Sequence, residues 1–255
     1  YKGRDYPVNK IDYDVYHLSI QQWGLYLMEA VCACMGINYL FYKSTAVFFF
    51  MLPLPFWYIH QRKKQQIRLR KKRLNYQFKD ALNAMQVGIS AGYSLDNTIR
   101  EARKDLERLY GEKAEMAREF AYIERQLGHS IPLEELLYDL GIRSRVEDIL
   151  NFTDVLIQAK KMGGNMRGIL NRCISSIEER IQVKKEIDAV LASRKMEQKI
   201  MSFIPLGIIL YMQITSPEFL SVLYGNPVGI CVMTACLLLY TAAFQWGVRL
   251  TQIDV

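Results

Sequence analysis

Histidine is scarce in this chain of 255 residues, and its scarcity limits the chemistry that the chain can perform. The three histidines, His17, His60 and His129, are too few and too scattered for a metal site. The P-loop motif G-x-x-x-x-G-K-S/T is absent, so we expect no nucleotide to be bound in that manner. We therefore predict a protein without a catalytic site, a cofactor or a metal.

Cysteine is also rare, and its positions favour free thiols over disulfides. Four of the five cysteines fall in stretches apolar enough for membrane helices, and none has a histidine at metal-ligand spacing. Disulfides are uncommon in cytoplasmic domains, and buried thiols behave as small apolar side chains. The five expected free thiols are Cys32, Cys34, Cys173, Cys231 and Cys236.

Charged residues are missing from two long stretches near the C-terminus, residues 200–217 and 219–248. A helix that spans a bilayer needs about 20 mostly apolar residues, so we predict two transmembrane helices within residues 199–248. A Gly-Asn-Pro sequence at 225–227 favours a turn between them. Residues 249–255 would then form a cytoplasmic tail.

The N-terminal apolar block is less uniform. Residues 23–41 are apolar except for one Glu and one Asn, and residues 45–59 are apolar but short and contain two prolines. We predict a transmembrane hairpin of two helices over residues 21–60, preceded by a cytoplasmic segment over residues 1–20. The alternative is a single long element that is tilted or re-entrant.

Acidic residues are absent from the stretch that follows this block, which is instead densely basic. Lys and Arg near the ends of membrane helices stay on the cytoplasmic side, so the run predicts a multi-pass protein of the cell membrane with both termini and the main domain in the cytoplasm. Attraction to anionic lipid is a further expected role. Nucleic-acid binding is not expected, because no aromatic residues interleave with the basic ones. The basic juxtamembrane segment covers residues 61–73 and contains Arg62, Lys63, Lys64, Arg68, Arg70, Lys71, Lys72 and Arg73.

Residues 74–198 show helical rather than strand periodicity. No run of alternating β-branched residues occurs, and apolar residues recur every three or four positions, so each helix would bury one face. We therefore predict an all-α fold, a multi-pass membrane protein with a cytoplasmic antiparallel helical-bundle domain. The apolar stripes are Phe78, Leu82, Met85 and Ile89; Leu95, Ile99, Ala102, Leu106 and Leu109; and Ile149, Phe152, Leu156 and Ala159.

The expected helix boundaries follow from glycines at helix ends and from Ser or Asn at helix starts. The last helix should continue into the membrane, because no Gly or Pro interrupts it between Gly168 and Pro205. The expected helices cover residues 75–91, 94–109, 113–127, 132–140, 145–162 and 165–198. The caps and hinges are Gly92, Ser94, Gly128, Ser130, Gly163, Gly164 and Asn165.

One motif matches a catalytic signature. Residues 88–92 fit the nucleophile elbow G-x-S-x-G, which works only at a turn from a strand into a helix. The residues before this match favour helix, and His129 is the only histidine that follows it. We therefore interpret Ser90 as a small residue near the end of a helix.

Glu29 is the one ionisable residue deep in an apolar segment, and an acid in that position is costly to bury. It could contact a partner helix or lie on a conduction path. Alternatively, it could form a hydrogen bond with Asn38 or a neighbouring helix of the same chain. With Glu29, the candidates for partner contacts in the membrane are Pro205, Pro217 and Glu218.

A series of short matches, ordered and spaced in a characteristic way, runs from residue 78 to the C-terminus. Through them the chain resembles the type II secretion system F domain, in the single-domain form of Tad (Flp) pilus platform proteins of the TadB/TadC type. Lys79 departs from the pattern, since the family usually has proline there. The matches are Asp80-Ala81-Leu82, Ala91-Gly92-Tyr93-Ser94-Leu95, Gly128, Pro132-Leu133-Glu134-Glu135-Leu136, Gly163-Gly164-Asn165-Met166, Leu170, Glu179-Arg180, Ala192, Lys199-Ile200-Met201-Ser202-Phe203-Ile204-Pro205, Pro217-Glu218-Phe219, Leu223, Gly247 and Ile253-Asp254-Val255.

The resemblance implies a non-enzymatic platform in the inner membrane, on which pilin subunits leave the bilayer. Its implied partners are a cytoplasmic hexameric secretion ATPase, a paralogous platform protein, pilin subunits and membrane lipid, and the platform itself should be a homo- or hetero-oligomer. The domain occurs once, which favours the Tad type. The continuous helix from Asn165 to Phe203 is a candidate lever.

Two other classes of protein remain open. A membrane-anchored signalling receptor would need sustained heptads and a sizeable outer sensing segment, and the sequence has neither. A small transporter would need more polar residues in the membrane than Glu29, Asn38 and Gln213.

Overall fold

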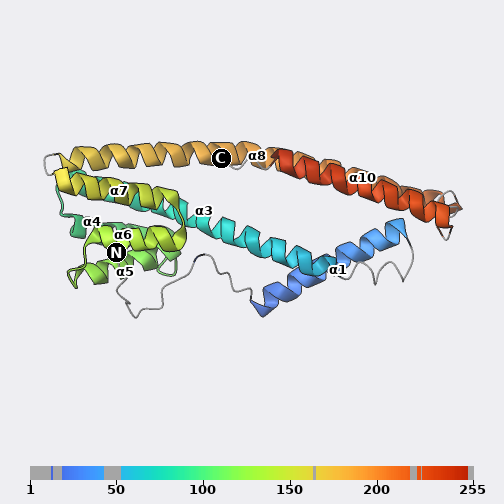
Figure 1. The fold of residues 1–255 in the computed structure, drawn as a ribbon, viewed down its shortest axis with the longest axis horizontal. Coiled ribbons are helices and arrows are strands. Elements are labelled where there is room, and N and C mark those ends of the chain that lie inside the picture. The colour runs from blue at the N-terminus through green and yellow to red at the C-terminus, as the bar shows by residue number, and fades with distance from the viewer. Residues whose placement is uncertain are drawn as a thin grey trace. The chain divides into compact units, whose positions relative to one another are not determined.

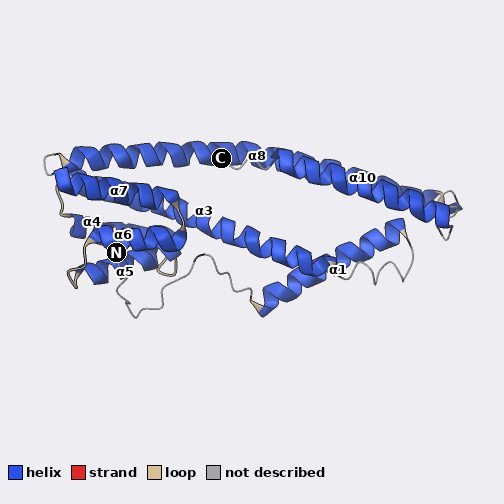
Figure 2. Cartoon of the chain, in the orientation of Figure 1, coloured by secondary structure: helices blue, strands red, loops and turns tan. Residues whose placement is uncertain are grey.

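The computed structural model of the chain describes residues 13, 19–42, 53–162, 165–218, 223–224 and 226–251. These residues form helices and contain no strand, so the all-α prediction is confirmed (Figure 2). Along the chain, the helices in Figure 1 are α1 (Ile20–Phe41), α3 (Leu54–Ser90), α4 (Leu95–Tyr110), α5 (Glu115–Leu127), α6 (Leu133–Ser144), α7 (Glu147–Met162), α8 (Met166–Thr215) and α10 (Pro227–Thr251).

Packing divides the chain into two compact units. The helical domain consists of Tyr1–His17 and Lys63–Val183, and the membrane unit consists of Leu18–Arg62 and Lys184–Val255. Helices α3 and α8 each contribute residues to both units. The helical domain therefore includes most of the basic run, which the sequence had suggested as a separate segment.

The core of the helical domain is built from the predicted stripes. All residues predicted on α3 and α7 are at most 3% exposed, and the rings of Phe78 and Phe152 meet edge to face at 6.0 Å. Edge-to-face contacts between aromatic rings add to the gain from burying them. Leu109 was wrongly predicted to be buried: it is 66% exposed because it lies in the last turn of α4, one residue before the helix ends.

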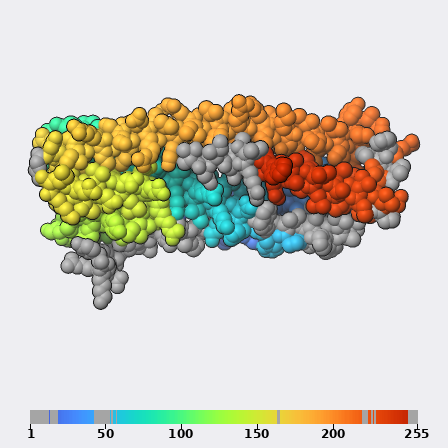
Figure 3. All heavy atoms as spheres, turned by 45° about the horizontal axis from the view of Figure 1, so that its top comes forward, coloured from blue at the N-terminus to red at the C-terminus, as the bar shows by residue number. Residues whose placement is uncertain are grey.

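Consecutive short helices pair within this domain. Helix α4 packs against α5, α5 against α6, and α6 against α7. Helix α7 and the first part of α8 lie side by side in Figure 1, and their atoms touch in the space-filling view of Figure 3. This arrangement is the antiparallel helical bundle predicted from the apolar stripes.

The helix ends show how local sequence sets the boundaries. Ser94 precedes α4, and its Oγ accepts a hydrogen bond from the backbone N of Asn97 at 3.3 Å. Gly92 adopts φ +87°, a left-handed conformation that glycine reaches without a steric cost. Asn165 precedes α8, and its Oδ1 accepts from the N of Gly168 at 3.1 Å. Gly163 and Gly164 lie outside the described residues.

One predicted cap was wrong. Gly128 lies at the C-terminal end of α5, but the N-cap of α6 is Pro132 and not Ser130. An N-cap residue has extended backbone angles, as Pro132 does with φ −61° and ψ 139°. Ser130 has φ 61° and so cannot fill that position.

Helix α3 begins at Leu54, about twenty residues before the predicted start at residue 75. No glycine or proline occurs between Pro55 and Gly88, so nothing in the sequence interrupts the helix across the basic run. The expected second membrane helix at 45–59 lies partly outside the described residues.

Two described helices, α1 and the Val228–Val248 part of α10, are long and apolar enough to cross a membrane. Most of the residues in both are exposed, which suits helices that face lipid. Of the four membrane passes predicted, these two meet the criteria of length and composition within the described part of the chain. Helix α8 continues through Pro205 to Thr215, so the last helix runs without interruption into the apolar segment, as predicted.

Polar side chains connect the helices of the membrane unit. The amide of Gln213 on α8 donates to the backbone O of Leu40 on α1 at 3.2 Å and to the hydroxyl of Tyr224 at 2.7 Å. Tyr240 on α10 donates to the backbone O of Ser202 on α8 at 2.7 Å. Because hydrocarbon offers polar groups no alternative partners, such bonds hold the helices in register.

Candidate functional site

The G-x-S-x-G match is not a nucleophile elbow. Ser90 is the last residue of α3, and its Oγ accepts a hydrogen bond from Asn171 Nδ2 at 3.3 Å. The preceding strand that the elbow requires is missing, since residues 54–90 are one helix. Among the described residues, no three His, Cys, Asp or Glu side chains gather as they would around a metal ion. Function is therefore to be sought in contacts between helices and in exposed surfaces.

A polar ladder joins α3 to α8 within the helical domain. Its members are spaced three or four residues apart on α3, so they share one face, and their partners run in the opposite order on α8. The ladder thus fixes both the antiparallel direction and the register of the two helices. The pairs are Lys79 with Glu178 at 3.3 Å, Asn83 with Glu178 at 3.1 Å, Gln86 with Ser175 at 3.2 Å, and Ser90 with Asn171 at 3.3 Å.

Asp148 on α7 adds a second connection to both of these helices. Its side chain is 5% exposed, accepts a hydrogen bond from Asn75 on α3 at 2.8 Å, and pairs with Arg180 on α8 at 3.3 Å. A buried carboxylate is tolerated only when it is paired and hydrogen-bonded. Asp148 therefore fixes the position of α8 relative to the bundle.

A buried ion pair connects α5 to α6. Glu119 is 5% exposed, and its two carboxylate oxygens each accept a hydrogen bond from Arg143. The Nε of Arg143 also donates to Asp139 at 2.8 Å. Burial alone would lower the pKa of Arg143, but the contacts with Glu119 and Asp139 outweigh it and raise the pKa above its usual range. The guanidinium is therefore held charged inside the domain.

The members of the basic run differ in exposure, and Arg62 and Arg70 form ion pairs with residues of other helices. Arg62 pairs with Glu29 on α1 at 3.2 Å, and it also donates to the Tyr58 hydroxyl. This contact gives Glu29 a partner on a neighbouring helix of the same chain. Arg70 pairs with Glu115 on α5 at 2.5 Å. The other members are half-buried at Lys63 and Lys71 and exposed at Lys64, Arg68, Lys72 and Arg73.

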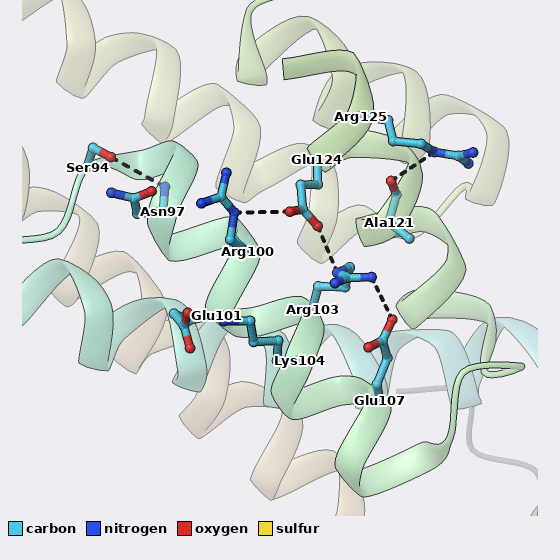
Figure 4. A network of polar contacts seen from close by, with 10 residues as sticks. All are labelled: Ser94, Asn97, Arg100, Glu101, Arg103, Lys104, Glu107, Ala121, Glu124 and Arg125. Carbon is cyan, nitrogen blue, oxygen red and sulfur yellow. Dashed lines mark hydrogen bonds and ion pairs between the residues drawn. The ribbon is translucent and has the colours of Figure 1, made fainter. Parts of the chain in front are cut away.

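A second network of charges lies between α4 and α5 (Figure 4). Glu124 on α5 accepts from Arg100 at 3.1 Å through one oxygen and pairs with Arg103 at 2.7 Å through the other. Arg103 also donates to Glu107 at 3.0 Å. Because these side chains are partly exposed, the network adds little stability and mainly fixes the pairing of the two helices.

The membrane unit exposes an apolar face on α8. A shallow hollow of about 490 Å³ is lined by Met196, Lys199, Ile200, Phe203 and Ile204, and Phe203 is 70% exposed. Pro205 lies exposed directly after this segment. The other two candidates, Pro217 and Glu218, lie exposed just beyond the end of α8.

The described residues thus define a class: an all-helical membrane protein whose domain is organised by contacts between helices. Residues 65–214 match the family model for type II secretion system (T2SS), protein F. The match covers more than half of the chain, so the chain belongs to this family. Proteins of the family are generally non-catalytic membrane platform proteins of type II secretion and type IV pilus-like systems. No curated protein and no solved structure matches the chain significantly.

Proposed function

We propose that this chain is the inner-membrane platform of a Tad (Flp)-type pilus or a type II secretion-like machine. In this role it couples a cytoplasmic secretion ATPase to the extraction and assembly of pilins. The family match over residues 65–214 carries the proposal, because it covers the helical domain and the part of α8 that continues into the membrane unit.

Helix α8 is the element proposed to pass movement from the helical domain to the membrane. It is a single helix of 50 residues, from Met166 to Thr215. Its N-terminal part is anchored in the domain by the ladder, by Asp148 and by buried apolar residues such as Ile174 and Ile181. A continuous helix is suited to this role because its backbone hydrogen bonds resist bending.

The apolar hollow on α8 is the proposed contact for pilin transmembrane segments. Its residues lie in the segment 196–204, where α8 leaves the charged sequence and becomes apolar. Helices associate in membranes mainly through close packing of their surfaces, for which an exposed apolar hollow is suited.

The sidedness of the chain is proposed from the basic run and from Tyr13. Tyr13 is fully buried in the helical domain, and α1 begins only seven residues later, at Ile20. Seven residues extend over at most ~25 Å, which is less than the ~30 Å core of a bilayer. The start of α1 therefore lies on the same side as the helical domain. The basic run makes that side the cytoplasm.

The proposal is tested by complementing a deletion strain. Replacing Ala192 and Ser193 by Gly-Gly weakens α8 between its two halves by about 1–2 kcal/mol of helix propensity. Pilus assembly should be lost while the protein still reaches the membrane in normal amounts. The control exchanges the two residues, as Ala192→Ser with Ser193→Ala, and should assemble pili normally. Normal assembly with Gly-Gly would disprove the lever, and normal assembly in the deletion strain would disprove the function.

A further inference from the structure

Tyr13 is separated in sequence from the Lys63–Val183 part of the helical domain, yet it lies in the core of that domain. The side chain is completely buried and lies in the same cluster as residues of α3, α5, α6, α7 and α8. Sequence patterns gave no sign of this, since Tyr13 lies outside every predicted helix. The burial of a single distant tyrosine points to a specific pocket.

The pocket offers the Tyr13 hydroxyl a charged acceptor. The hydroxyl donates a hydrogen bond to Glu119 Oε1 at 2.9 Å, and the same oxygen accepts from Arg143 Nη1 at 3.0 Å. Burial, followed by the nearby Glu119 carboxylate, raises the pKa of Tyr13 far above its ordinary value, so the phenol remains protonated and able to donate. A phenylalanine ring could fill the same space but could not donate a hydrogen bond to this carboxylate.

The aromatic ring has a charged neighbour as well. The guanidinium of Arg70 lies over the ring at 4.9 Å from its centre, and Arg70 is held there by Glu115. A cation placed over an aromatic face attracts the ring. Glu119 pairs with Arg143 and Glu115 pairs with Arg70, so the charges around the pocket are balanced without the tyrosine.

We propose that these residues of α3, α5 and α6 form a tyrosine-binding site, and that Tyr13 occupies it to anchor the N-terminal segment to the helical domain. The inference does not depend on the role in pilus assembly. The site recognises both parts of a tyrosine: Arg70 binds the ring, and Glu119 binds the hydroxyl. Because the charged residues of the pocket are paired with one another without Tyr13, the tyrosine can leave the pocket without unfolding the domain.

Limited trypsin digestion of the purified full chain tests the anchor through cleavage after Lys10. A protease must bind several residues on each side of the bond in an extended form, and Tyr13 is the third residue beyond this one. The cleavage rate therefore follows the fraction of molecules in which Tyr13 is detached. We expect Tyr13→Phe to accelerate this cleavage about tenfold, the effect of one lost hydrogen bond to a charged group. Tyr13→Ala should accelerate it by at least a further factor of about ten, since ring burial is lost as well.

The matched controls are Tyr93→Phe and Tyr93→Ala, at a tyrosine that is 56% exposed on the same domain. Neither should change the rate after Lys10. Cleavage after the exposed Arg108 of α4 reports whether the domain itself has unfolded, and it should stay constant in all variants. Equal rates after Lys10 in the wild type and both Tyr13 variants would overturn the anchor. Acceleration by Ala but not by Phe would overturn recognition of the hydroxyl.

Discussion

Arg143 on α6 and Glu119 on α5 form a two-pronged ion pair, with Nη1 to Oε1 at 3.0 Å and Nη2 to Oε2 at 2.8 Å. The pair is buried, at 15% and 6% side-chain exposure. Helices α4 and α5 form one hairpin, and α6 and α7 form a second. The ion pair joins α5 of the first hairpin to α6 of the second. The two hairpins are thus held together by charge as well as by apolar packing.

Removing one member of this pair should destabilise the domain strongly. Arg143→Ala leaves the Glu119 carboxylate buried with too few donors, so the free energy of unfolding should fall by about 3–5 kcal/mol. Urea unfolding of the purified protein, followed by circular dichroism, measures the change. Lys104→Ala removes the exposed pair with Glu101 and should cost less than about 1 kcal/mol. Similar losses of unfolding free energy in Arg143→Ala and Lys104→Ala would show that the buried pair stabilises the domain no more than an exposed pair does.

The turn before α4 should require glycine at position 92. At φ +87° a Cβ atom is strained, and it would also lie 3.3 Å from Arg167 Nη2. We expect Gly92→Ala to lower the free energy of unfolding by about 1–2 kcal/mol, and Gly92→Asn to cost less because Asn tolerates left-handed backbone. Urea unfolding followed by circular dichroism measures the unfolding free energy of both variants. An Ala variant as stable as the wild type would show that the turn relaxes freely.

The hydroxyl of Tyr110 should lose its proton at an unusually high pH. A hydrogen bond to Asp80, together with partial burial, raises its pKa from 10.0 to about 12. Since the folded pKa is the higher one, the contribution of Tyr110 to stability is complete below pH ~10 and is lost as the pH rises towards ~12. The Cζ resonance of ¹³C-labelled tyrosine, assigned by its loss in Tyr110→Phe, should shift near pH 12. Titration near pH 10 would mean that the bond to Asp80 does not form in solution.

The orientation of the chain can be tested with protease. Trypsin added to inside-out membrane vesicles should cut after Lys113, which is exposed in the turn between α4 and α5, whereas trypsin added to the outer face of spheroplasts should not. Peptides identified by mass spectrometry report the cleavage. A periplasmic protein must remain intact in the vesicles as the control for sealing. Cutting from the outside would reverse the proposed topology.

Apolar periodicity predicted the helices of the domain to within a few residues at most ends. The stripe on α7, for example, is buried at all four predicted positions. Local patterns suffice there because each helix buries one continuous face against its neighbours. The start of α3 was missed because a change of composition, from apolar to basic, was taken as a change of structure.

The polar contacts that organise the domain were not predicted. Lys79, Asn83 and Gln86 repeat at helical spacing, a signal that could have suggested a polar face on α3. Their partners on α8 lie about ninety residues away, and nothing in local sequence specifies such distant pairing. The same applies to Tyr13, whose pocket exists only when α3, α5 and α6 are brought together.

The most direct test of the central claim is cross-linking followed by purification of the full chain from cells that assemble the pilus or secretion machine. The platform role predicts that the cytoplasmic hexameric secretion ATPase and a pilin precursor are both recovered, each identified by mass spectrometry. Recovery of the ATPase should fall when Arg143→Ala destabilises the helical domain, and it should persist in Lys104→Ala. Recovery of neither the ATPase nor a pilin with the wild-type chain would contradict the account.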